Sequence, residues 1–247
     1  MHYHVLVVGS VDEVDSMLAP YDENIEVEPY ISSTRKELIE DGRVWANRQL
    51  QDPDSYYHEY LNDPLSLFNH YSYIIADEVE KFFKELPNVD SKSDDEFWKI
   101  YPFKAGKNLD EDGNEVSTYN PDSRWDWYQV GGRWAGGIKL KDTVDYSKYE
   151  FPNFSWGWSE DSKAKRIVSG GVDSAMIKDI ADLENLTTYA YLDNNGWEDK
   201  DDFIQIDYKN DTDEEINAKY EKWNQHILER LKKLSPETWI TVVDCHI

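Results

Sequence analysis

Cysteine and long apolar runs are scarce in this sequence, and each scarcity excludes a class of protein. The single cysteine, Cys245, cannot form an intrachain disulfide, which fits a reducing compartment. No apolar run approaches the roughly 20 residues that a membrane-spanning helix needs. The first residues, MHYHVLVVGS, lack the basic start and the small-residue cleavage site of a signal peptide. We therefore expect a cytoplasmic protein with no membrane partner.

Basic residues are scarce as well, because 26 lysines and arginines stand against 51 aspartates and glutamates, a formal net charge of −25. Such a charge repels nucleic acid at long range, so direct nucleic-acid binding is not expected. Two interpretations stay open. The charge keeps a solvated surface soluble, or an acidic face acts as a nucleic-acid mimic that fills the basic groove of a nucleic-acid enzyme. The acidic clusters are scattered along the chain, at 94–96, 110–112, 198–202 and 211–215.

The two ends of the chain both have the pattern of a β-strand. HYHVLVVG at 2–9 and WITVVD at 239–244 are rich in β-branched residues. We expect both segments in one sheet, which predicts a single domain over residues 1–247. With 39% hydrophobic and 14% aromatic residues, the chain has ample material for a core.

Between the ends, three segments carry apolar residues at helical spacing: 33–50, 72–86 and 211–234. Thr212 and Glu215 form a capping box at the start of the last one. An Asn-Gly turn predicts a hairpin with strands around 189–192 and 203–206. A further helix is expected at 173–183. Two polar segments without a period are expected to form long loops: 51–64 and 104–124. The predicted fold class is α+β, a mixed or antiparallel sheet including both terminal strands, with helices packed on it.

The stretch WDWYQVGGRWAGG, residues 125–137, has the pattern of a second hairpin. Glycine tolerates positive φ at both central positions, so Gly131-Gly132 predicts a two-residue turn with Val130 opposite Arg133. Alternation then separates two faces. One face is expected to hold Trp125, Trp127, Gln129 and Trp134. The other is expected to hold Asp126, Tyr128, Val130 and Arg133.

An arginine fork beside aromatic rings suits a phosphate, carboxylate or nucleobase ligand. The expected ligand-binding residues are those of this hairpin and of an early loop: Trp125, Asp126, Tyr128, Arg133, Trp134, Asp22, Glu23 and Asn24. The alternative interpretation is structural. In it, the tryptophans pack into a core, and Arg133 pairs with one of the many carboxylates.

SGGVDS at 169–174 matches the pyrophosphate-binding loop of the ATP pyrophosphatases. That loop follows a buried parallel strand, whereas here the charged SEDSKAKR precedes it, so we interpret the match as a coincidence. Asp173 instead predicts the N-cap of the helix at 173–183. The segment from Asp110 begins with the spacing of a calcium loop, but Glu115 and Pro121 stand where glycine and glutamate are required.

Histidine and aspartate residues recur at the two ends of the chain. His2 and His4 share one face of the first strand, and Asp244 and His246 share one face of the last. If these strands are neighbours, the four residues converge as candidate metal ligands, although no metal is favoured and no cofactor is predicted. If the protein is an enzyme, four residues are candidates for acid, base or metal ligand: Asp126, Asp173, Asp244 and His246.

Four segments resemble a group of uncharacterised proteins encoded in tailed-phage genomes: HVLVVG at 4–9, LAPYDENIEVEPY at 18–30, NPDSRWDWYQVGGRW at 120–134 and TVVDCHI at 241–247. Their order and spacing match over most of the chain, and WDWYxxGGRW is the specific core. In that group a basic run and Gly-Asp-Ile-Asp replace SGGVDS, with Asp173 as the matching position. The resemblance implies a phage origin and an infected bacterial host, and it implies no reaction.

Acidic accessory proteins of phages are often counter-defence factors, an argument from association. Our leading hypothesis is a counter-defence or host-takeover protein that binds and inhibits a host protein, a nucleic-acid-processing or defence enzyme, through its acidic surface. The alternative is a binder of a small anionic ligand such as a nucleotide, or a metal-assisted nucleotide or phosphodiester hydrolase, at WDWYQVGGRW. Whether the protein is an enzyme stays open, with binding favoured.

Overall fold

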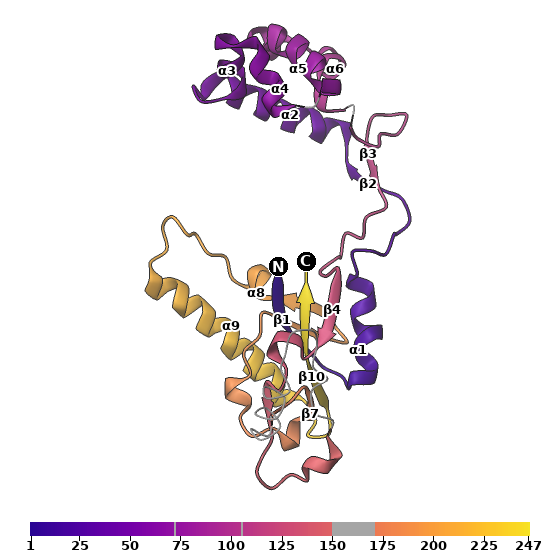
Figure 1. Ribbon diagram of the computed structural model, residues 1–247, viewed down its shortest axis with the longest axis vertical. Helices are drawn as coiled ribbons and strands as arrows, with labels where there is room; N and C mark the ends of the chain where they lie inside the picture. The colour runs from indigo at the N-terminus through magenta and orange to yellow at the C-terminus, as the bar shows by residue number, and fades with distance from the viewer. Residues whose placement is uncertain (72, 105, 150–170) are drawn as a thin grey trace. The chain divides into compact units, whose positions relative to one another are not determined.

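The computed structural model describes all residues other than 72, 105 and 150–170, and the chain divides into two compact units (Figure 1). Unit 1 comprises Met1–Ile25 and Asn120–Ile247, and unit 2 comprises Glu26–Tyr119. Compactness does not show whether a unit folds independently, so the single domain over 1–247 stays a prediction.

A mixed sheet forms the centre of unit 1, in the strand order β4-β10-β1-β8-β9, and β7 also pairs with β10. The strands are β1 (His2–Val7), β4 (Trp127–Val130), β7 (Ser174–Met176), β8 (Ala190–Asp193), β9 (Gly196–Asp199) and β10 (Trp239–His246). β1 pairs antiparallel with β10 along its whole length and parallel with β8. The α+β class and the prediction that both terminal strands lie in one sheet are confirmed.

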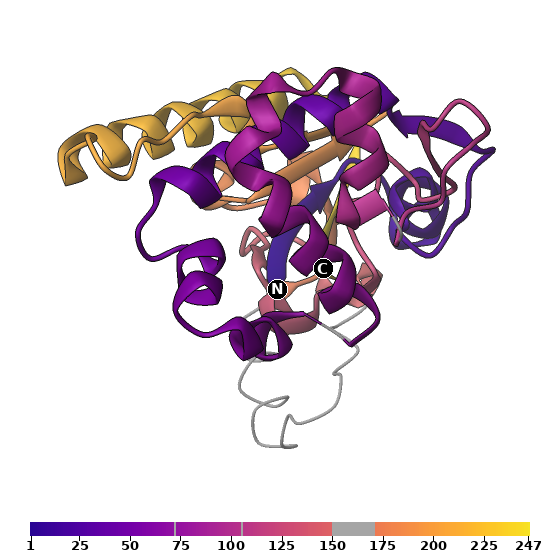
Figure 2. The same cartoon turned by 90° about the horizontal axis from the view of Figure 1, so that it is seen from above.

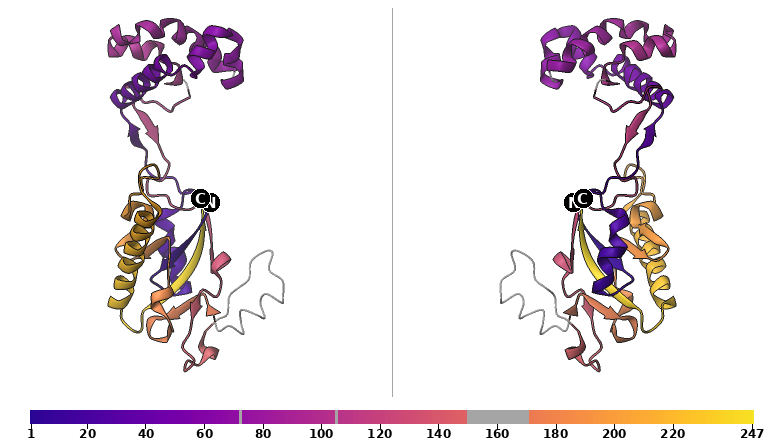
Figure 3. Two further views of the ribbon diagram at one scale, coloured as in Figure 1. Left: turned by 90° about the vertical axis from the view of Figure 1, so that its left-hand side faces the viewer. Right: turned by 90° about the vertical axis from the view of Figure 1, so that its right-hand side faces the viewer.

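Helices cover both faces of this sheet, as Figures 1 and 3 show. The side chains of β1 alternate, so Val5 and Val7 pack with α1 (Val11–Leu18), while Leu6 packs with α9 (Asp213–Lys233). α9 begins at the predicted capping box of Thr212 and Glu215 and buries Trp223 against the sheet. Two apolar cores therefore lie on opposite faces of the sheet, one under each helix.

The predicted hairpin exists, but its turn and its second strand lie elsewhere. Asn194 and Asn195 form the turn between β8 and β9, and Gly196, with φ +117°, is the first residue of β9, so the second strand begins there and not at 203–206. The chain then turns into α8 (Lys200–Phe203), because Asp199 caps that helix by accepting a hydrogen bond from the Asp202 backbone.

The predicted hairpin at 125–137 is wrong. β4 pairs with β10, 110 residues and more away in the chain, with Tyr128 opposite Cys245 and Val130 opposite Val243. After β4 the backbone leaves the sheet in a 3-10 turn at Gly132–Trp134 and continues into β5 (Ile138–Lys139). Long-range pairing with a buried strand outcompetes the local turn, because β10 buries both of its faces.

The helix predicted at 173–183 is also wrong. β5 pairs with the short strand β6 (Gly171–Val172), and β7 follows directly, so Asp173 links two strands and caps no helix. Within SGGVDS, Ser169 and Gly170 lie outside the described residues, and the described remainder is extended.

Unit 2 is helical (Figure 2). Its helices are α2 (Arg35–Gln51), α3 (Tyr56–Asn62), α4 (Leu67–His70), α5 (Tyr73–Glu85) and α6 (Asp94–Ile100), beside a ribbon of β2 (Tyr30–Ser33) and β3 (Glu115–Ser117). α2 and α5 confirm two predicted helices. The loop predicted at 51–64 is wrong, because Ser55 caps α3 there, and β3 interrupts the loop predicted at 104–124. Within the described ranges, no helix combines the length and apolarity needed to cross a membrane.

Candidate functional site

Both chain termini lie at the same end of the sheet (Figure 1), and polar and aromatic side chains of β1, β4 and β10 gather there. His2 lies opposite His246, and His4 lies opposite Asp244. On the other side of β10, Trp127 lies opposite His246. Because directly opposed residues share a face of the sheet, these side chains meet on the α9 face. The four residues His2, His4, Asp244 and His246 therefore converge, as expected if their strands were neighbours.

Two histidine–carboxylate pairs lie side by side in this group. His2 Nδ1 is 2.8 Å from Asp244 Oδ1, and His246 Nδ1 is 2.8 Å from Asp126 Oδ1. The two imidazole centres are 4.9 Å apart, and the Trp127 ring stacks on His246 at 5.3 Å. His246 Nε2 is 3.3 Å from the amino group of Met1. With each Nδ1 held by a carboxylate, Nε2 is the remaining nitrogen of each ring, and on His246 a ligand would have to displace the Met1 amino group to reach it.

The carboxylates of the two pairs differ in their surroundings. Asp244 is buried, whereas about 28% of the Asp126 side chain is exposed. Desolvation raises the pKa of Asp126, but hydrogen bonds from His246 and from the Trp127 backbone outweigh it and lower the pKa overall. Asp126 is therefore ionised at neutral pH and orients His246 as a charged acceptor.

Two buried aspartates also hold the glycine-rich loop after β4. Asp244 Oδ2 accepts from the Arg133 backbone at 2.9 Å, and Asp173 Oδ1 accepts from the Gly136 backbone at 2.6 Å. Gly131 and Gly132 have positive φ, and a Cβ on either would fall within 2.4 Å of Asp173 or Asp244. The glycine pair is required because the loop passes directly over two carboxylates. Asp173, a candidate catalytic residue, thus positions this loop.

The predicted partition of faces is wrong for the aromatic residues. Trp125 is buried on the α1 side, where its Nε1 donates to the Leu18 carbonyl and Tyr128 packs against it at 5.0 Å. Trp127 lies on the opposite face and is 43% exposed. The partition assumed that strand alternation continues from Trp125 through the turn, whereas β4 spans only Trp127–Val130.

The early loop borders this site as expected. Asn24 Nδ2 donates to the Asp126 carbonyl at 2.9 Å and to Asp22 Oδ1, and the Glu23 backbone donates to the Trp125 carbonyl. These bonds fix the loop against the backbone of 125–126. The Arg133 side chain is exposed and forms no ion pair with any residue that the structure describes.

A cavity of about 340 Å³ opens beside the histidine–carboxylate pairs. His4 and Trp134, stacked with ring centres 5.3 Å apart, form one wall. The other lining residues come from the segment before β8, from α8 and from α9: Thr187, Thr188, Tyr189, Lys200, Tyr220, Trp223 and Asn224. This volume lies within the range of small-molecule sites, roughly 300 to 1,000 Å³.

His4 contributes a buried nitrogen to this cavity. Its Nε2 is inaccessible to solvent and has no hydrogen-bond partner among the described residues. Burial lowers the pKa of His4 from 6.5 to about 4, although a hydrogen bond to the Thr187 backbone and the charge of Asp244 act in the opposite direction. A neutral imidazole therefore faces the cavity at neutral pH, with one polar atom unsatisfied.

Lys200 contributes a positive charge. Its ammonium lies 4.5 Å from the centre of the Tyr220 ring and 5.4 Å from that of Tyr189. Within the described part of the chain it forms no ion pair, although acidic residues outnumber basic ones two to one. An ammonium between aromatic rings that forms no ion pair with a described carboxylate is poised to attract an anion.

The pKa of His4 predicts a pH-dependent stability. Between about pH 4 and pH 6.5 the unfolded chain binds a proton at this histidine that the folded chain excludes, so the free energy of unfolding rises with pH in this window. The shift corresponds to about 3 kcal/mol, lost by pH 4. Urea titrations from pH 4 to 7 should show this slope for the wild type. His4→Gln should make the slope shallower by the contribution of this one proton, and an unchanged slope would contradict the assignment.

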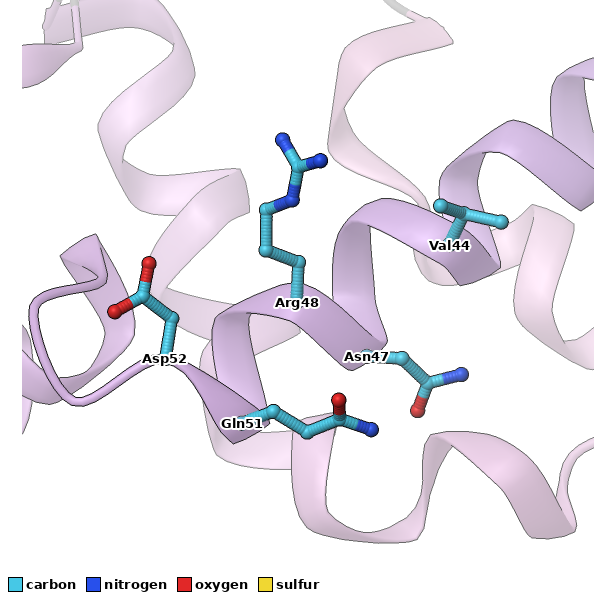
Figure 4. Close-up of a pocket in the computed structure, with 5 residues that line it drawn as sticks. All are labelled: Val44, Asn47, Arg48, Gln51 and Asp52. Carbon is cyan, nitrogen blue, oxygen red and sulfur yellow. The ribbon is translucent and has the colours of Figure 1, made fainter. Parts of the chain in front are cut away.

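Unit 2 has a depression of about 540 Å³ along α2 (Figure 4). Its lining residues all come from this helix and its C-cap: Val44, Asn47, Arg48, Gln51 and Asp52. In Figure 4 the side chain of Arg48 extends away from those of Asn47 and Gln51. These five lining residues form one wall of the depression, and no described residue forms a wall opposite them. The cavity of unit 1 is therefore the better candidate for a ligand site.

Among the described residues, no three or more histidine, cysteine, aspartate or glutamate side chains are placed to hold a metal ion. Sequence reasoning named Trp134 as a ligand-binding residue and His4 as a weak candidate for a metal ligand. It missed the other lining residues of the cavity: Thr187, Thr188, Tyr189, Lys200, Tyr220, Trp223 and Asn224. Lys200 stands within the acidic run EDKDD, which indicates only a solvated surface. Tyr220 and Trp223 belong to the apolar stripe of the helix predicted at 211–234, and such a stripe predicts packing in a core and not a ligand site.

No family model, no curated protein and no solved structure matches this chain.

Proposed function

We propose that this protein binds a small anionic aromatic ligand, of the nucleotide class, in the cavity lined by His4, Trp134 and Lys200. One observation carries the proposal. In a chain of net charge −25, this cavity combines an ammonium that has no ion pair in the described residues with a buried histidine nitrogen that has no partner there. Both groups gain an interaction when an anionic ligand with polar edges enters.

The cavity walls favour an aromatic ligand. Trp134 and Tyr220 are only partly buried and offer ring surface, and stacking of a base on an aromatic side chain contributes about 1–3 kcal/mol. Lys200 supplies the charge for a phosphate, and His4 Nε2 and Asn224 supply polar contacts for a base edge. In an infected bacterium, such a protein would act in counter-defence by sequestering a small nucleotide signal.

Calorimetric titration with AMP, GMP, CMP and UMP tests this proposal, with adenosine as the uncharged comparison. We expect at least one monophosphate to bind, and Lys200→Met to weaken its affinity about tenfold or more, since a charge-assisted contact contributes about 1.5–3 kcal/mol. Lys222→Met is the matched control, because Lys222 is exposed on α9 and does not line the cavity. Equal affinities for the wild type and Lys200→Met would contradict the proposal.

Inhibition of a host protein through the acidic surface is a second proposal. The observation in its favour is that acidic clusters of both units are exposed, with 74% of the Asp95 side chain and 78% of the Asp202 side chain accessible. Binding of a partner through such charges should weaken steeply between 0.05 and about 0.5 M salt, because the Debye length falls below about 10 Å. A complex that survives high salt unchanged would contradict this mechanism.

A further inference from the structure

We propose that the two histidine–carboxylate pairs beside the cavity form a metal-independent acid–base site that hydrolyses a phosphodiester of the bound nucleotide. The inference rests on the proposed function, since the cavity must first hold the nucleotide. It extends that function from binding to catalysis. The catalytic residues are His2 and His246, and their positioning residues are Asp244 and Asp126.

The same arrangement of an imidazole and a carboxylate occurs twice at this site. Each imidazole is fixed through Nδ1 by one carboxylate at 2.8 Å, which selects the tautomer and the ring orientation. The two rings are centred 4.9 Å apart in an edge-to-face arrangement. General acid–base cleavage of an ester needs one group to remove a proton and a second to supply one at the same centre. Two oriented imidazoles at this separation meet that requirement.

The cavity and the histidine pair adjoin along β1. His2 and His4 are two residues apart on the same face of the strand, a separation of about 7 Å. Asp244, which binds His2, lies opposite His4 and acts on its charge. A nucleotide seated against His4 and Trp134 therefore brings an ester group to His2 along one face of the sheet.

One further group is placed to assist. Trp127 stacks on His246 and is 43% exposed, so it excludes water from one side of that imidazole.

The proposed reaction uses water as its second substrate. His2 accepts a proton from the water, and the water oxygen forms a bond to phosphorus. The phosphorus–oxygen bond to the leaving alcohol breaks, and protonated His246 donates its proton to that oxygen. The products are a phosphate monoester and an alcohol, and the proton on His2 returns to His246 through solvent. Buried Asp244 stabilises the imidazolium that forms on His2.

The test uses 2′,3′-cyclic AMP as the probe, in the presence of EDTA, with chromatography of the ring-opened monophosphate. We expect turnover by the wild type and a loss of at least 100-fold in His2→Gln and in His246→Gln, because general acid–base catalysis contributes about 10²–10⁴. His226→Gln is the matched control, since His226 forms the same kind of pair with Glu198 at 2.7 Å on α9. It should retain full activity.

Asp126→Asn tests the positioning role. We expect kcat to fall with KM nearly unchanged, because the amide no longer holds the Nδ1 side of His246 as the charged carboxylate does and the ring loses its fixed orientation. A merely structural effect would weaken substrate binding and raise KM as well. Circular dichroism and calorimetric binding of AMP confirm that each variant is folded.

The outcomes separate the two proposals. If 2′,3′-cyclic AMP and AMP bind without cleavage, the acid–base site is wrong and the nucleotide cavity stands. If neither they nor GMP, CMP and UMP bind, both proposals fail. Cleavage that persists in His2→Gln or His246→Gln also overturns the acid–base assignment.

Discussion

Replacing Gly132 by alanine is expected to destabilise unit 1 by about 3–5 kcal/mol. Gly132 has φ +47°, which costs an alanine strain, and the added Cβ would lie 2.3 Å from the Asp244 Cβ. Asp244 cannot move away without losing its hydrogen bonds to His2 and to the Arg133 backbone. The free energy of unfolding in urea, followed by tryptophan fluorescence, gives the measurement.

Gly106→Ala is the control for this substitution. A Cβ at Gly106 meets nothing within 4 Å, and its φ is not in the left-handed region, so the change should stay within about 0.5 kcal/mol. If Gly132→Ala proves as mild as the control, the close passage of the loop over Asp244 is incorrect.

Replacing Trp223 by alanine is expected to cost about 3–5 kcal/mol as well. Trp223 is 1% exposed within the core under α9, and its Nε1 donates to the Thr188 carbonyl. Truncation leaves a cavity and an unpaired carbonyl beneath the ligand site. The expected result is a lower midpoint of urea unfolding together with loss of AMP binding.

Trp127→Ala provides the contrast for Trp223→Ala. The exposed ring of Trp127 stacks on His246 at the surface, so its removal should cost less than about 1 kcal/mol. Equal losses from the two tryptophans would show that the α9 face is not the main core of unit 1.

The sequence predicted those parts of the fold whose signal is local or terminal. Thr212 and Glu215 determine the start of α9 by themselves, and the alternation of His2–Val7 and Trp239–His246 identifies two strands of one sheet. The 125–137 stretch could not be predicted in this way. Its glycine pair indicates a tight turn, yet the reason for it is the approach of Asp244 and Asp173, which lie more than 35 residues away.

The candidate site was predictable only in part, for a similar reason. Side-chain alternation placed His2, His4, Asp244 and His246 on shared faces, and strand pairing brought them together. Lys200 and Tyr220 became cavity residues only because α8 and α9 pack beside β1, and nothing near them in the sequence encodes this arrangement.

The most direct test of the ligand cavity is the ¹⁵N resonance of His4 Nε2, observed by imidazole NMR during titration with AMP and assigned by its absence in His4→Gln. The account predicts that this nitrogen, unpartnered among the described residues, gains a hydrogen bond, so its resonance moves to saturation with the calorimetric affinity while His4 stays neutral at pH 7. Saturated binding that leaves the His4 resonance in place and perturbs other histidines would contradict the central claim.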